Sequence, residues 1–109
     1  MDINKYSLNT WIYLIDKCLK VPFIEEYTTM GSNINRLLWS NGDPTEHYKD
    51  DRYKSNWGIG ISFDYKTEEI KYIRIVKNGE LLSFISFMEL FESEFLSCNR
   101  EIEISKLIK

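Results

Sequence analysis

The chain has 109 residues, of which 17 are acidic and 14 are basic, giving a formal net charge of −3; 43% of the residues are hydrophobic and 15% are aromatic. This length suits a single domain over residues 1–109, with a hydrophobic core, and is too short for two domains. The aromatic content argues against disorder, and the surplus of acid excludes broad, salt-driven binding to nucleic acid.

The N-terminal region does not have the pattern of a signal peptide or a membrane span. Its apolar run over residues 11–15 is ended by Asp16 and Lys17, whereas a membrane span needs about 18 uninterrupted apolar residues. The two cysteines, Cys18 and Cys98, are too few for a secreted disulfide framework, and we expect two free thiols packed as small hydrophobic groups. A disulfide requires that the two helices carrying them touch. We expect a cytoplasmic protein.

The first third of the sequence predicts helices. Apolar residues at helical spacing indicate a helix over residues 8–20, with Ser7 or Asn9 as its N-cap and Pro22 as its stop. A second helix is predicted over residues 22–27, before Gly31. The stretch over 33–39 is ambiguous and fits a short helix capped by Ser32. A turn at 41–44 and a polar loop or frayed helix over 45–56 follow.

The middle of the sequence predicts an antiparallel sheet. Strict alternation of apolar residues from Trp57 to Tyr65 indicates a strand with one buried face, in which we expect Trp57 to belong to the core. A turn at residues 66–68 leads to a second strand over 70–76, which is rich in β-branched residues. The dipeptide Asn78-Gly79 is a strong hairpin signal, because both turn positions need positive φ. Residues 81–85 are the predicted third strand.

The last part of the sequence predicts one helix. Ser86 and Glu89 match a capping box, with Ile85 and Leu90 placed for the hydrophobic staple, and the helix runs through Cys98. Residues 101–104 alternate again and predict a short terminal strand or a docked tail. The sequence therefore predicts an α+β fold: an antiparallel sheet of three to four strands, with N-terminal helices and one late helix packed on one face.

Residues suited to catalysis or metal binding are few. The one cluster of metal-ligating residue types is Glu46, His47, Asp50 and Asp51. A single imidazole among loop carboxylates does not define a metal site, and nothing in the sequence fixes a nucleophile beside His47. We therefore expect no metal, no cofactor and no enzymatic activity. A small nuclease using His47 with Lys49 or Lys54 remains the enzymatic alternative.

Two features of the predicted strands have ordinary structural explanations. Gly58 and Gly60 alternate on one strand face, where they let another element pack close to the sheet. A small basic patch with an aromatic residue is formed by Lys71, Tyr72, Arg74 and Lys77. We interpret it as an exposed strand edge protected by charge.

Negative charge is concentrated in two segments. Residues 43–69 contain seven acids and four bases, and residues 89–105 contain five acids and one base. In the first segment, tyrosines and tryptophan stand among the acids, as a docking site for a basic protein surface requires: aromatic side chains provide anchors, and carboxylates steer the partner. The predicted contact residues are Asp43, Glu46, Tyr48, Asp50, Asp51, Tyr53, Asp64, Glu68 and Glu69.

Two stretches resemble a known class of bacterial proteins. Residues 51–63 (DRYKSNWGIGISF) are similar to the central strand region of immunity proteins from polymorphic toxin systems such as contact-dependent growth inhibition. Residues 85–91 (ISFMELF) resemble the strand-to-helix step of SUKH-type immunity domains. No alanine or glutamine occurs, and Ile, Lys, Asn, Tyr and Phe make up 45 of the 109 residues, as in A/T-rich bacterial genes. The resemblance implies a cytoplasmic protein that binds one cognate toxin domain.

The predicted function is therefore stoichiometric neutralisation. An acidic, aromatic surface binds the substrate groove of a toxin domain, typically a nuclease, as a 1:1 complex of a monomer, without direct contact with nucleic acid. Such an interface buries on the order of 800 Å² per partner. Besides the His47-dependent enzyme, the alternative is a small regulatory or adaptor domain that binds a peptide, or a second copy of itself, through a sheet edge.

Overall fold

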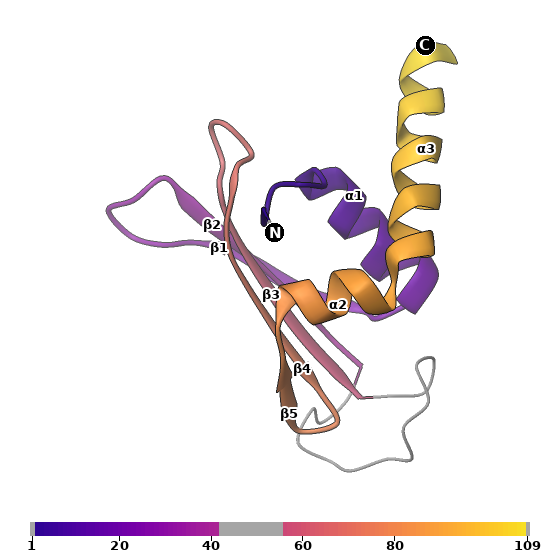
Figure 1. Ribbon diagram of the computed structural model, residues 1–109. Helices are drawn as coiled ribbons and strands as arrows, with labels where there is room; N and C mark the ends of the chain where they lie inside the picture. Colours follow the sequence, from indigo (N-terminus) through magenta and orange to yellow (C-terminus); the bar gives the residue numbers. More distant parts are fainter. Residues whose placement is uncertain (1, 42–55, 109) are drawn as a thin grey trace.

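The computed structural model describes residues 2–41 and 56–108. The elements are α1 (Leu8–Tyr13), the π-helical turn η1 (Leu14–Leu19), β1 (Phe23–Thr28), β2 (Ile34–Ser40), β3 (Trp57–Asp64), β4 (Ile70–Lys77), β5 (Glu80–Leu82), α2 (Phe84–Leu90) and α3 (Glu92–Ile108). The strands form one antiparallel sheet in the order β1-β2-β3-β4-β5, and the helices lie on one side of it (Figure 1). The predicted α+β class is confirmed, with five strands where three to four were expected.

The N-terminal helical segment agrees with its prediction. The Ser7 hydroxyl accepts a hydrogen bond from the backbone N–H of Thr10 at 3.2 Å, so Ser7 is the N-cap. The helix continues as η1 and ends where Lys20 adopts a left-handed conformation with φ of 55°. The helix therefore ends before Pro22, the predicted stop, and β1 begins directly after that proline.

The predicted second helix over residues 22–27 is wrong, because this segment forms the edge strand β1. The predicted short helix over 33–39 is also wrong, since it forms β2. Gly31 adopts φ of +77° in the turn that joins the two strands. The spacing of Ile34, Leu37 and Leu38 is compatible with a helix or with a strand. Pairing with β3, in which Leu37 lies opposite Ile61, makes the segment a strand.

The central strands agree with the sequence pattern. Along β3, Trp57, Ile59, Ile61 and Phe63 are buried. Asn78 and Gly79 have φ of 51° and 82°, as the two-residue hairpin between β4 and β5 requires. The third strand was predicted over residues 81–85, and this is too long, because β5 ends at Leu82. The predicted turn at 41–44 and loop at 45–56 fall almost entirely outside the described residues.

The helix after the sheet begins one turn earlier than predicted. Ser83, not Ser86, is the N-cap of α2, and its hydroxyl accepts a hydrogen bond from the backbone N–H of Ser86 at 3.1 Å. The predicted capping box is therefore wrong, although its serine lies in the first turn. The strand or tail predicted at residues 101–104 is also wrong, since α3 runs through it. Ile102, partly buried, extends the helical spacing of the buried Phe95 and Cys98.

Aromatic side chains join the two layers. Phe87 of α2 meets Trp57 of β3 edge to face, with ring centroids 5.6 Å apart. Phe95 of α3 meets Trp11 of α1 with centroids 4.7 Å apart, and Trp11 stacks on Phe87. The sheet is thus bound to α2, and α2 to both α1 and α3, through one continuous core (Figure 1).

Candidate functional site

Three of the nine predicted contact residues fall within the described part of the chain. Asp64, Glu68 and Glu69 lie at the turn between β3 and β4, where Glu68 and Glu69 are exposed. The other six, Asp43, Glu46, Tyr48, Asp50, Asp51 and Tyr53, lie outside the described residues. Their predicted role stays a prediction.

The Asp64 side chain shapes the turn. Its Oδ1 atom accepts hydrogen bonds from the backbone N–H groups of Lys66 at 2.8 Å and Thr67 at 3.2 Å. Glu68 then adopts φ of 64°, and the backbone N–H of Asp64 donates to the carbonyl of Glu69 at 2.9 Å. Asp64 therefore has a structural role, which leaves Glu68 and Glu69 as the more accessible carboxylates of the turn.

Two hairpin turns meet at this end of the sheet. The backbone N–H of Tyr65 donates to the carbonyl of Asn33 at 3.0 Å, and the Tyr65 hydroxyl donates to Asn33 Oδ1 at 3.1 Å. These bonds fix the β3–β4 turn against the β1–β2 turn. Figure 1 shows the tip of the β1–β2 hairpin pointing away from the helices, and the tip of the β3–β4 hairpin at the height of α1.

We call the resulting region the hairpin-end surface and define it as Glu26, Met30, Asp64, Tyr65, Glu68 and Glu69. Met30 is 98% exposed, and Tyr65 is 45% exposed. The four carboxylates of this surface outnumber the two nearby ammonium groups, those of Lys66 and Lys71. Lys71 Nζ pairs with Glu69 Oε2 at 3.3 Å. The surface therefore combines apolar anchors with excess negative charge, the combination that was expected for a docking site.

The predicted contact residues did not include three members of this surface, Glu26, Met30 and Tyr65. Glu26 lies in the segment that was predicted as helix, and Met30 lies in the turn that follows it. The available signal was the run of polar and small residues around Gly31, between two segments rich in β-branched and aromatic residues. Glu26 is held in place by Asn35, whose Nδ2 donates to its Oε2 at 2.7 Å.

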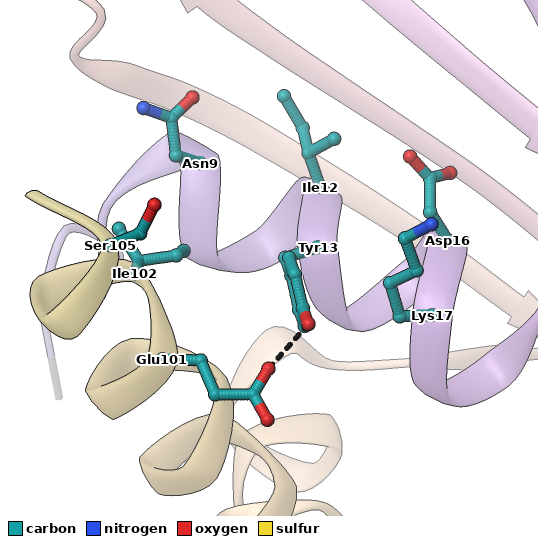
Figure 2. A pocket seen from close by; sticks show the side chains of 8 residues that line it. All are labelled: Asn9, Ile12, Tyr13, Asp16, Lys17, Glu101, Ile102 and Ser105. Atoms are coloured by element: carbon teal, nitrogen blue, oxygen red, sulfur yellow. Dashed lines mark hydrogen bonds between the residues drawn. The ribbon is translucent and has the colours of Figure 1, made fainter. Parts of the chain in front are cut away.

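A groove of about 570 Å³ separates α1 and η1 from α3. In Figure 2, the Tyr13 and Glu101 side chains point toward one another across it, and the Tyr13 hydroxyl donates a hydrogen bond to Glu101. This bond raises the pKa of Tyr13. Asp16, also on the groove, accepts a hydrogen bond from the indole N–H of Trp39 at 2.9 Å. These polar groups hold α1 and η1 against α3 and β2.

The two cysteines lie side by side between η1 and α3. The Sγ atoms of Cys18 on η1 and Cys98 on α3 are 3.5 Å apart, and both thiols are free. Burial, together with the neighbouring Cys18 thiol, raises the pKa of Cys98 to about 12. The condition stated for a disulfide, contact between the two helices, is therefore met.

Across residues 2–41 and 56–108, no group of three or more His, Cys, Asp and Glu side chains is placed to hold a metal ion. Within these ranges, no helix is long and apolar enough to cross a membrane. His47, with Glu46, Asp50 and Asp51, lies outside them, so the proposed histidine chemistry stays untested.

Comparison with known proteins gives no further guide. The search found no matching family model, no similar curated protein and no similar solved structure.

Proposed function

We propose that this chain is an immunity-type binding protein that neutralises a cognate toxin domain by occupying its basic surface in a 1:1 complex. The observation that supports this proposal best is the hairpin-end surface. There, hydrogen bonds from Tyr65 to Asn33 bring two turns together, so that the exposed Met30 and four carboxylates share one end of the sheet.

The chemistry of this surface suits a basic partner. The flexible side chain of Met30 and the flat ring of Tyr65 both offer apolar contact area to a partner groove. The surrounding carboxylates attract a basic surface from a distance and fix the orientation in which it docks. A nuclease domain carries such a basic surface where it holds nucleic acid. The neutralised toxin would be one that acts in the cytoplasm, where we place this protein.

The test begins with the gene immediately upstream, which should encode a large secreted protein ending in a toxic domain. We expect co-expression of this chain to restore growth of cells that make the toxic domain, and calorimetry to give a 1:1 complex. The double reversal E68K/E69K should weaken binding at least about tenfold and make it less dependent on salt. The matched control is E92K/E103K, which reverses two exposed acids on α3.

Two results would contradict the proposal. One is a wild-type chain that neither binds the toxic domain nor restores growth. The other is an E68K/E69K variant that binds as tightly as its α3 control, which would remove the hairpin-end surface from the interface.

A second candidate function is an adaptor that pairs through a sheet edge, and the exposure of β1 favours it. Every residue of this edge strand is exposed, with Phe23 at 49% and Ile24 at 57%. An open apolar edge is a template for another strand. Light scattering decides between the two functions: a stable homodimer that Ile24→Lys dissociates supports the adaptor, and a monomer supports the toxin-binding protein.

A further inference from the structure

The face of the sheet opposite the helices carries a second candidate site, distinct from the hairpin-end surface. Strand register places Leu38 and Arg74 on either side of Gly60, and Arg36 opposite Ser62. These positions alternate with the buried Leu37, Ile61 and Ile73, so their side chains point away from the helical layer. Figure 1 shows the helices on the other side of the sheet only.

This face is hollowed at its centre. A groove of about 320 Å³ is lined by Ile24, Arg36, Leu38, Gly60, Arg74 and Val76, among others. Its floor depends on a glycine: a Cβ atom at Gly60 would lie 3.0 Å from Arg36 Nη2 and 3.2 Å from Leu38 Cδ2. The absence of a side chain at residue 60 therefore lets the Arg36 guanidinium lie flat against the sheet.

The two arginines of the groove have no anionic partner among the described residues. Arg36 Nε is buried and makes no hydrogen bond, and neither guanidinium pairs with a carboxylate of residues 2–41 or 56–105. By contrast, the nearby Lys71 pairs with Glu69 at 3.3 Å. A buried donor without an acceptor is uncommon in a folded protein, and a bound oxyanion would supply the missing acceptor.

From this geometry we infer that the groove binds a small phosphate monoester carried on a planar ring. A guanidinium group matches phosphate oxygens in a two-pronged arrangement, and two guanidinium groups balance the charge of nearly −2 that a phosphate monoester carries near neutral pH. Gly58, opposite Val76, lines the same groove beside the Arg36 guanidinium and leaves room for a ring. Tyr72 on the same face of the sheet is 56% exposed and available for stacking.

The size and charge of the chain favour a small ligand over a polynucleotide. The groove volume of about 320 Å³ is near the lower end of small-molecule sites. The net charge of −3 opposes the counterion-driven binding of a long polyanion. This inference does not rest on the proposed function, because it uses another face of the molecule and a ligand of opposite charge to the toxin surface.

Titration of the ¹⁵N-labelled full chain with adenosine monophosphate, followed by NMR, tests the inference. We expect amide shifts at Leu38, Gly60 and Arg74. Arg36→Gln and Arg74→Gln should each weaken binding at least about tenfold, the size expected for loss of a charge-assisted hydrogen bond. The matched control is Arg100→Gln, which removes an exposed guanidinium from α3. Thermal unfolding of each variant verifies that the fold is kept.

Three further probes separate the parts of the ligand. Adenosine, which lacks the phosphate, and inorganic phosphate, which lacks the ring, should both bind more weakly than the monophosphate. The inference is overturned if the monophosphate moves no amide of the groove, or if both arginine variants bind as well as Arg100→Gln. A short single-stranded oligonucleotide that binds more tightly than the mononucleotide would also overturn it and identify a nucleic-acid surface.

Discussion

Oxidation of the cysteine pair should stabilise the fold. With the Sγ atoms of Cys18 and Cys98 already 3.5 Å apart, formation of a bond of about 2.05 Å needs only a small shift of η1 against α3. The two cysteines are 80 positions apart in sequence, and closing a loop of this length removes chain entropy from the unfolded state worth about 4.5 kcal/mol. Allowing for strain in the closed bond, we expect a net gain of about 3 kcal/mol.

The reaction is a two-electron oxidation by a small disulfide such as oxidised glutathione. The two protein thiols lose two protons and two electrons, and the reagent is reduced to two thiols. Cys18, the more accessible thiol, reacts first, and the Cys98 thiolate then displaces the bound reagent. Because the pKa of Cys98 is raised to about 12, this second step should accelerate with increasing pH.

Urea unfolding of the oxidised and reduced protein measures the effect, and intact mass confirms the loss of two hydrogen atoms. Cys18→Ser is the control, since it keeps Cys98 in place and removes the partner thiol. An oxidised monomer no more stable than the reduced one would refute the reasoning, as would oxidation that gives only dimers linked between chains.

Three further predictions concern stability. The pKa of the buried Cys98 thiol is raised from 9.0 to about 12, so the thiol holds its proton more tightly in the folded state. Its contribution to the free energy of unfolding is therefore complete below pH 9 and is lost between pH 9 and 12. Cys98→Ala should flatten this part of the pH dependence in urea unfolding. Gly79→Ala, at φ of 82°, should cost about 1 kcal/mol, measured by thermal unfolding, whereas Asn78→Gly should change little. Asp64→Ala should cost about 1 kcal/mol through its lost turn hydrogen bonds, whereas Glu68→Ala should leave unfolding unchanged; equal effects would contradict the assigned roles.

The parts of the fold that the sequence predicts are those in which local pattern and burial agree. The strand from Trp57 is unambiguous because one face is buried and the other carries glycine, serine and aspartate. The hairpin at Asn78-Gly79 follows from backbone sterics alone. Both features need no knowledge of distant partners.

The errors arise where a distant partner decides the outcome. The segment of Ile34 to Trp39 satisfies helical spacing, and only its pairing with β3 makes it a strand. Ser83 and Ser86 are equally good caps, and the choice depends on which turn brings Phe87 onto Trp57. The same limit applies to the candidate sites, because Arg36 lies over Gly60 and Asn33 bonds to Tyr65, residues that are far apart in sequence.

The order in which the layers are synthesised has a consequence for how the chain folds in the cell. The sheet is complete at Leu82, yet Phe87 and Phe95, which cover Trp57 and Trp11, are translated afterwards. Until α2 and α3 leave the ribosome, only α1 and η1 can cover the apolar face of the sheet. The nascent chain therefore carries exposed apolar surface beside the open edge of β1, an arrangement prone to aggregation. We therefore expect truncation before residue 84 to yield insoluble protein, and chaperones to engage this intermediate.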